Sequence, residues 1–219
     1  MTQGDHVAAA RAVYTASADR YVEFVGTQIN ARTESAVDRS LLSAFVELVG
    51  VRTGERVVDV GCGPGRVAAF LADHGLDVTG VDVSPGMLEA ARLAHPDLTF
   101  VEGRLDELPV DDGTLGGMVC WYSIIYTPPD RLVAVFGESA RVLASHGYLM
   151  LAFQAGDGEA IHTGDAHGSG LPLVSYRHAV ADVADRLGRA GFVVHATAIR
   201  EPEFDHETTP QAFVIARHA

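Results

Sequence analysis

Short apolar runs that favour strands alternate with runs that favour helices between residues 57 and 154. The expected strands are Val57–Val60, Asp77–Val81, Leu98–Val101, Leu115–Tyr122 and Tyr148–Phe153. The expected helices lie between them at 67–73, 85–94 and 128–143, with Ser84 and Thr127 as N-caps of the last two. This alternation predicts a mainly parallel sheet that is covered by helices on both faces.

The two ends of the chain extend this prediction. Residues 7–50 carry apolar positions at helical spacing, residues 155–170 form a polar loop, and a helix is expected near 178–190. Two strand-like runs, 193–199 and 212–216, follow with no helix between them, which favours an antiparallel pair. We therefore expect an α/β, Rossmann-like, seven-stranded, mainly parallel sheet with an antiparallel C-terminal strand pair.

The composition limits the class of protein. A chain of 219 residues is most simply one domain, and its formal net charge of −13 disfavours nucleic acid as a partner. No apolar run reaches the ~18 residues that a membrane span needs, and the first residues lack the pattern of a secretion signal. Two cysteines are too few for a disulfide framework, so we expect a cytoplasmic protein.

The loop after the first expected strand contains three alternating glycines, in the stretch VVDVGCGPGR. In an open α/β sheet the ligand lies beyond the carboxyl ends of the strands, where this loop begins. The dinucleotide fingerprint G-x-G-x-x-G, counted from Gly61, requires glycine where this chain has Arg66. Asp82 closes the second strand about 20 residues later, where a carboxylate can accept hydrogen bonds from both ribose hydroxyls. A tight turn without a ligand is the alternative for the glycines, and a helix cap is the alternative for Asp82.

Four successive stretches resemble the motifs of class I S-adenosylmethionine-dependent methyltransferases. They are VVDVGCGPG, VTGVDVSPGMLEAAR, FVEGRLDELPVDDGTLGGMV and ARVLASHGYLMLAF, in order over residues 55–154. The stretch CWYSIIYTPP and the C-terminal run are most similar to small bacterial members of that family. The resemblance implies one methyltransferase domain, with a helical lid at 1–50, a cofactor-binding core at 55–154 and an acceptor side at 155–219.

The resemblance also implies which residues contact S-adenosylmethionine and its product, S-adenosylhomocysteine. Asp59 is expected near the ammonium group of the cofactor, Asp82 at the ribose, and Val83 and Met87 beside the adenine. The full implied set is Tyr21, Asp59, Gly61, Cys62, Gly63, Asp82, Val83, Met87, Gly103, Arg104, Leu105, Cys120, Trp121 and Tyr122. Arg104 departs from the family, where an aspartate accepts from the adenine amino group. Arginine has donors only, so Asp106, a backbone carbonyl or packing must hold the base.

The residues for catalysis are sought in the polar loop after the fifth strand. His162 is the expected general base, with Asp165 and His167 beside it, because imidazole titrates near neutral pH. Tyr126 is expected as a pocket wall or hydrogen-bond donor, and Arg177 and Glu201 are further candidates for acceptor binding. Tyr14 and Tyr21 are seven residues apart and can share a helix face. No metal site is expected.

These observations predict methyl transfer to a small-molecule acceptor, at oxygen or nitrogen, by a monomer or a homodimer. Two alternatives stay open. The same fold can bind S-adenosylmethionine while it catalyses a rearrangement or cyclisation without methyl transfer, or it can serve as a non-catalytic binding module. A dehydrogenase is disfavoured, because Arg66 and the antiparallel C-terminal pair both oppose it.

Overall fold

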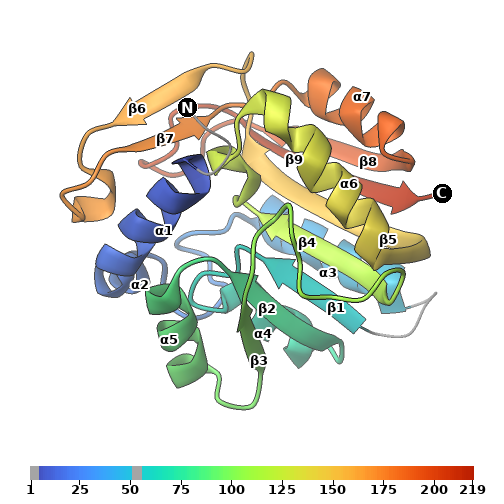
Figure 1. The fold of residues 1–219 in the computed structure, drawn as a ribbon, viewed down its shortest axis with the longest axis horizontal. Coiled ribbons are helices and arrows are strands. Elements are labelled where there is room, and N and C mark those ends of the chain that lie inside the picture. Colours follow the sequence, from blue (N-terminus) through green and yellow to red (C-terminus); the bar gives the residue numbers. More distant parts are fainter. Residues whose placement is uncertain (1–4, 51–55) are drawn as a thin grey trace.

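A computed structural model describes residues 5–50 and 56–219. Residues 1–4, where a secretion signal was sought, and residue 55, the expected first residue of the core, lie outside the described residues. A seven-stranded sheet with the strand order β3-β2-β1-β4-β5-β9-β8 forms the centre of the fold (Figure 1). Its strands are β1 (Arg56–Val60), β2 (Asp77–Asp82), β3 (Thr99–Glu102), β4 (Leu115–Trp121), β5 (Leu143–Gln154), β8 (Phe192–Arg200) and β9 (Gln211–His218).

The pairing of the strands confirms the predicted sheet. β3, β2, β1, β4 and β5 are parallel to their neighbours, whereas β9 is antiparallel to both β5 and β8. A connection without a helix can return only an antiparallel strand, which explains the C-terminal pair. Because β1, β2 and β4 are parallel, their carboxyl ends lie on the same side of the sheet, and the glycine loop lies there.

Helices cover both faces of the sheet. One face packs against α3 (Ala36–Gly50), α4 (Arg66–Asp73) and α5 (Pro85–Ala94), and the other packs against α6 (Leu132–Val142) and α7 (Val180–Arg189). Successive residues of a strand point to opposite faces, so Val57 is buried in the first core and Val58 in the second. Burial on both sides explains why β4 has no charged residue and why three of the five residues of β1 are valines.

Of the two helices with a predicted N-cap, one begins later than expected. Helix α6 begins at Leu132, so the prediction of a start at Pro128 with Thr127 as its cap was wrong. Pro128 has an extended backbone (φ −55°, ψ 144°), because the residue before a proline disfavours the helical region and Pro129 follows it. Helix α5 keeps its predicted cap, since the Ser84 hydroxyl accepts a hydrogen bond from the Met87 amide at 3.2 Å.

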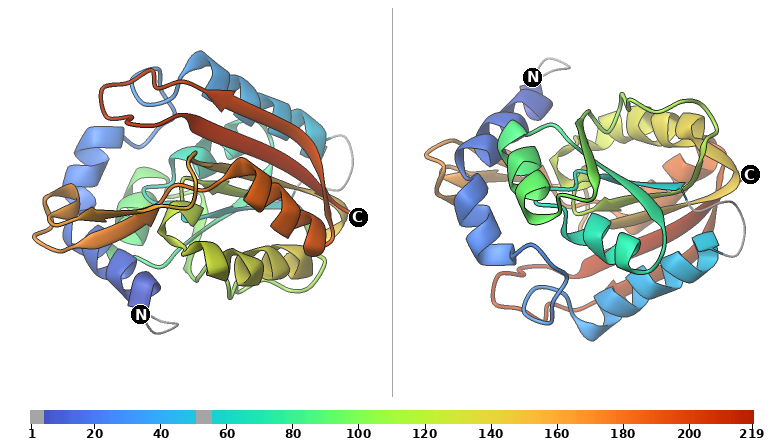
Figure 2. Two further views of the ribbon diagram at one scale, coloured as in Figure 1. Left: turned by 90° about the horizontal axis from the view of Figure 1, so that it is seen from above. Right: turned by 90° about the horizontal axis from the view of Figure 1, so that it is seen from below.

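The N-terminal region contains three helices, α1 (Asp5–Ala16), α2 (Ala18–Val25) and α3, with a non-helical stretch at 26–35. Ser35 and Asp38 end that stretch with a capping box: the Asp38 amide donates to the Ser35 hydroxyl at 3.2 Å, and the Ser35 amide donates to the Asp38 carboxylate at 2.9 Å. Helix α3 then packs on the sheet, whereas α1 and α2 lie at one end of it (Figure 2).

The predicted polar loop at 155–170 is largely an ordered hairpin. Strand β6 (Ala160–Thr163) pairs with β7 (Leu173–Tyr176), and a short 3-10 turn, η3 (Ala166–Gly168), lies between them. The hairpin lies next to α1 and α2 (Figures 1 and 2). In the described parts of the chain, every helix is too short or too polar to cross a bilayer.

Candidate active site

A cavity of about 290 Å³ opens at the carboxyl ends of β1, β2 and β4. Its walls come from the glycine loop, from α1 and α2, from the segment after β4, and from the η3 turn of the hairpin. Ligands of open α/β sheets bind at the carboxyl ends of the parallel strands.

The glycine loop has a backbone that ordinary residues disfavour. Gly61, Gly63 and Gly65 all have positive φ angles, of 73°, 52° and 83°. A Cβ atom at Gly61 would lie 2.2 Å from the Cβ of Ser123, whose hydroxyl donates to the Val60 carbonyl at 2.7 Å. Gly61 is thus required both by its dihedral angles and by the close approach of the segment after β4.

Asp82 is held at the end of β2 by two backbone amides. The Gly63 amide donates to Oδ2 at 2.9 Å, and the Ser84 amide donates to Oδ1 at 2.8 Å. Both Gly63 and Asp82 line the cavity. The carboxylate is therefore fixed in orientation, while its remaining lone pairs are free to accept from a ligand hydroxyl.

Most of the residues that the resemblance implied for cofactor binding surround the cavity. They are Tyr21, Gly61, Gly63, Asp82, Val83, Met87, Gly103, Arg104, Leu105, Trp121 and Tyr122. Asp59, Cys62 and Cys120 are buried and do not contribute to its walls. Burial raises the pKa of both thiols, so the cysteines remain neutral and pack as small apolar groups.

Asp59 lies beneath the loop in an unusual state. Its Oδ2 accepts a hydrogen bond from the Ala68 amide at 3.0 Å, whereas Oδ1 is buried and has no protein partner among the described residues. Burial raises the pKa of Asp59 to about 7, and the hydrogen bond from Ala68 opposes this only partly. The carboxyl group of Asp59 is thus enclosed beneath the loop and does not line the cavity.

The guanidinium group of Arg104 at the cavity wall is paired with a carboxylate and is not a free charge. Its guanidinium donates to both carboxylate oxygens of Asp106, at 2.9 Å each. Both residues line the cavity. The departure from the family pattern at Arg104 is thus accompanied by an acidic partner two residues later, and the prediction that Asp106, a backbone carbonyl or packing holds the base stays a prediction.

The polar side chains expected to serve catalysis are separated by the structure. His162 is exposed on β6 and does not line the cavity, since its strand runs past the opening. Arg177 pairs with Glu159 at 3.5 Å, and Glu201 is exposed; neither lines the cavity. Asp165 accepts from the Gly170 amide at 2.7 Å within the hairpin.

Tyr14, Tyr126 and His167 do come together at the cavity wall. The hydroxyl groups of Tyr14 and Tyr126 are 2.5 Å apart, and the Tyr14 hydroxyl is 3.2 Å from Nε2 of His167. Tyr21 packs edge-on against Tyr14, with ring centroids 5.2 Å apart, although the two rings come from α2 and α1 and not from one helix as their spacing predicted. Tyr126 is therefore both a cavity wall and a hydrogen-bonding group.

Sequence reasoning missed the ion pair of Arg66 and Glu34, which are both buried residues of the cavity wall. Arg66 also donates to the Val25 carbonyl at 2.9 Å and to the Thr33 hydroxyl at 3.0 Å. The residue that breaks the dinucleotide fingerprint therefore anchors the segment after α2. Glu34 carries no local sequence signal, because its partner is 32 residues away.

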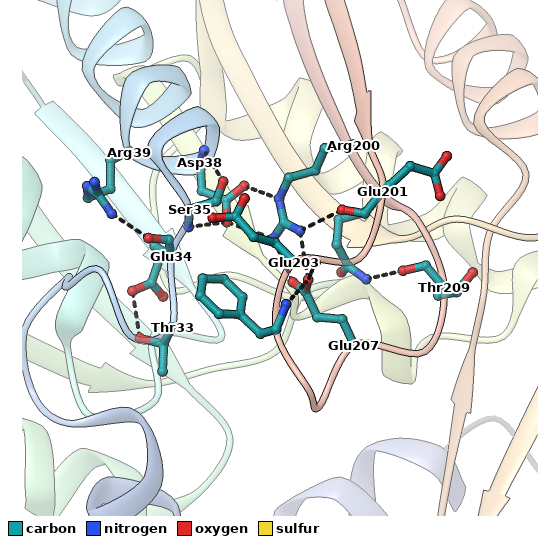
Figure 3. Close-up of polar contacts among 12 residues, drawn as sticks. Thr33, Glu34, Ser35, Asp38, Arg39, Arg200, Glu201, Glu203, Glu207 and Thr209 are labelled. Atoms are coloured by element: carbon teal, nitrogen blue, oxygen red, sulfur yellow. Dashed lines mark hydrogen bonds and ion pairs between the residues drawn. The ribbon is translucent and has the colours of Figure 1, made fainter.

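A second buried arginine was also missed. Arg200, at the end of β8, donates to both oxygens of Asp38 at 2.7 and 2.8 Å and to both oxygens of Glu207 at 2.6 and 2.7 Å (Figure 3). Burial disfavours the charged form of Glu207, but hydrogen bonds from Arg200 and from the Glu203 amide outweigh it and lower its pKa. Since Glu207 lines the cavity, this cluster fastens the β8–β9 connection to α3 beside the site.

Comparison with known proteins agrees with this geometry. A family model described as a methyltransferase domain matches residues 57–147. Residues 57–147 therefore carry a methyltransferase domain of the class I S-adenosylmethionine-dependent type. It is 36% identical over 116 residues to a demethylmenaquinone methyltransferase of Beutenbergia cavernae, an alignment that covers 53% of this chain and 48% of the relative. It is 26% identical to a malonyl-[acyl-carrier protein] O-methyltransferase of Serratia marcescens, over 67% of this chain and 60% of the relative.

Solved structures share the fold of this chain over nearly its whole length. The magnesium protoporphyrin IX methyltransferase of Synechocystis with bound S-adenosylmethionine aligns with a TM-score of 0.71 and 21% identity, and the match covers 98% of each chain. The [4+2]-cyclase SpnF aligns with a TM-score of 0.74 and 17% identity, over 95% of each chain. By contrast, the chain spans about half the length of the curated relatives that it matches.

Proposed function

We propose that this chain transfers a methyl group from S-adenosylmethionine to a small-molecule acceptor, at oxygen or nitrogen. The observation that carries the proposal is the cradle of Gly61, Gly63 and Asp82 at the sheet edge, within a matched methyltransferase domain. S-adenosylmethionine supplies an activated methyl group on a sulfonium and leaves as S-adenosylhomocysteine.

The polar and apolar groups of the cavity match the parts of that cofactor. The Asp82 carboxylate would hold the ribose hydroxyls, and the backbone at Gly61 and Gly63 would pass beside the methionine part. Val83 and Met87 offer apolar contacts for the adenine, and the free oxygen of Asp59 lies below the loop. Each of these groups has the chemistry that the corresponding part of the cofactor requires.

The N-terminal helices would exclude water from the reaction. Arg11 of α1 donates to the Val83 carbonyl at 2.7 Å, and the hydroxyls of Thr15 and Ser84 are 3.0 Å apart, which ties α1 to the adenine side. Arg20 of α2 donates to the Gly168 carbonyl of the hairpin at 2.5 Å. We infer that α1 and α2, without α3, are the lid, and that they hold two reactants in one small enclosed space.

A second function stays in view because of one neighbour. The cyclase SpnF has the same fold as this chain, and its name describes a reaction other than methyl transfer. Formation of S-adenosylhomocysteine during turnover separates the two functions, since only methyl transfer generates it.

The first test is calorimetric titration of the full chain with S-adenosylhomocysteine. We expect micromolar binding that weakens at least about tenfold, or 1.4 kcal/mol, in Asp82→Asn and further in Asp82→Ala. Asp77→Ala is the matched control, because Asp77 is an exposed aspartate at the opposite end of the same strand. Heat with NADH instead of S-adenosylhomocysteine, from a folded and ligand-free protein, would overturn the proposal.

A further inference from the structure

Three side chains from distant parts of the chain form a hydrogen-bonded row at the cavity wall. Tyr126 ends the 3-10 turn η1 (Ile124–Tyr126), Tyr14 lies on α1, and His167 lies in the η3 turn. The Tyr126 and Tyr14 hydroxyls are 2.5 Å apart, and the Tyr14 hydroxyl is 3.2 Å from the imidazole Nε2. All three line the cavity.

The row runs from the interior of the site to the surface. Tyr126 and Tyr14 are partly buried, whereas His167 is exposed. A tyrosine hydroxyl donates one hydrogen bond and accepts others, and a neutral imidazole has one nitrogen that only accepts. The hydrogen bonds can therefore all run in one direction, from Tyr126 to Tyr14 and from Tyr14 to His167. His167 is the last group of the row and contacts solvent.

We propose that Tyr126, Tyr14 and His167 form a proton path that removes the proton of a hydroxyl group on the acceptor. This inference rests on the proposed function and names its acceptor class, a neutral alcohol or phenol. The acceptor proton moves to the Tyr126 oxygen, the Tyr126 proton to the Tyr14 oxygen, and the Tyr14 proton to Nε2 of His167. Three bonds to hydrogen break and three form, and the imidazolium then releases the proton to solvent.

The protonation states agree with this direction of transfer. Burial raises the pKa of both tyrosines, so their hydroxyl groups stay neutral and pass the proton on. Neither tyrosine keeps the proton that the acceptor loses. Although the His167 side chain as a whole is exposed, its ring loses hydration where it packs against Tyr14 and Tyr21. This desolvation lowers the pKa of His167, so the imidazole is neutral and able to accept a proton at neutral pH. The groups that face His167 are the hydroxyl of Tyr14, the ring of Tyr21 at 5.4 Å, and Arg20, which is bound to the neighbouring Gly168 carbonyl.

A hydroxyl acceptor fits this path better than the other classes. A carboxylate carries no proton at neutral pH and needs no base. A protonated amine would bring a cation into the site, but the cavity carboxylates of Glu34, Asp106 and Glu207 are each already paired with an arginine. The remaining one, Asp82, is assigned to the ribose in the proposed function. A neutral hydroxyl requires proton removal without requiring a counter-charge.

The test is nitrogen NMR of the histidines in the full chain with S-adenosylhomocysteine added. We expect His167 to carry its proton on Nδ1 at neutral pH, with Nε2 accepting from Tyr14, and to titrate below the ordinary pKa of about 6.5. Tyr14→Phe should abolish the hydrogen-bonded Nε2 signal and raise the pKa of His167 toward that ordinary value. Tyr21→Phe is the matched control, since it removes a hydroxyl from a ring that also contacts His167.

A proton on Nε2 of His167 at neutral pH would overturn the path, and so would equal responses to the two variants. Because this readout requires no methyl transfer, its failure is distinguishable from a failure to bind S-adenosylhomocysteine. The methylated product is the check on the acceptor class. A methyl ether supports the hydroxyl acceptor, whereas a methyl ester or an N-methyl product overturns it.

Discussion

Replacement of Asp59 by asparagine should make the protein more stable at alkaline pH while it weakens the cofactor site. Asp59 is buried under the glycine loop, and one of its oxygens has no protein partner among the described residues. Asparagine has the same shape and its carbonyl can still accept from the Ala68 amide. The substitution therefore removes the buried charge without leaving a cavity or a lost hydrogen bond.

The magnitude follows from the two pKa values of the carboxyl group. The pKa of Asp59 is about 7 in the folded chain, and that of an aspartate in an unfolded chain is about 3.9. Because the folded pKa is the higher one, the stabilisation that it contributes is fully present below about pH 4 and is lost as the pH rises through about 7. Between pH 5 and pH 8 this loss amounts to about 2–3 kcal/mol of unfolding free energy.

The assay is urea unfolding of both proteins at pH 5 and at pH 8, without cofactor. We expect the stability of Asp59→Asn relative to the unsubstituted chain to increase by about 2–3 kcal/mol between the two pH values. Asp77→Asn is the control for loss of one surface carboxylate. A stability difference that does not change with pH would refute the reasoning, because it would mean that Asp59 does not hold its proton in the folded chain. Calorimetry should show weaker binding of S-adenosylhomocysteine by the same variant.

Two further substitutions test the framework of the site. Gly61→Ala should destabilise the chain by about 1–3 kcal/mol more than Gly75→Ala in thermal or urea unfolding. Both glycines have positive φ (73° and 88°), but only an alanine at position 61 meets a neighbour, the Ser123 Cβ at 2.2 Å; equal costs would contradict the close approach. Arg200→Met should cost about 3–5 kcal/mol in urea unfolding, because it leaves the largely buried carboxylates of Asp38 and Glu207 without a counter-charge. Arg189→Met, which removes an exposed i,i+4 pair, should cost less than about 1 kcal/mol, and similar losses would mean that the Arg200 cluster is not structural.

Local patterns carried most of the fold prediction. The apolar runs of β1 and β4, the proline after Ser84 and the alternating glycines act over a few residues, so their periodicity and caps are visible in the chain itself. The start of α6 was missed although its cause is equally local, since Pro129 keeps Pro128 extended. The hairpin β6–β7 was missed because two four-residue strands carry too little periodicity to stand out among polar residues.

The position of the glycine loop and of Asp82 at the cavity was predictable for the same reason. Gly61, Gly63 and Asp82 lie at ends of strands that follow each other in the chain, and the parallel sheet brings those ends to one edge. The acceptor side was not. His162 was preferred to His167 on sequence alone, yet only His167 lines the cavity, since the hairpin turn directs it toward α1.

The sequence by itself determined the alternation of strands and helices, the glycine loop at the carboxyl ends of the strands and the resemblance to class I methyltransferases. The tertiary structure alone decided which distant side chains meet: Arg66 with Glu34, Tyr14 with Tyr126 across 112 residues, and Arg200 with Asp38 across 162 residues. The physical reason is the range of the interactions. Helix caps and hydrophobic periodicity depend on residues within one or two helical turns. A buried ion pair or the hydrogen-bonded row of Tyr126, Tyr14 and His167 forms only after the sheet has brought distant loops together.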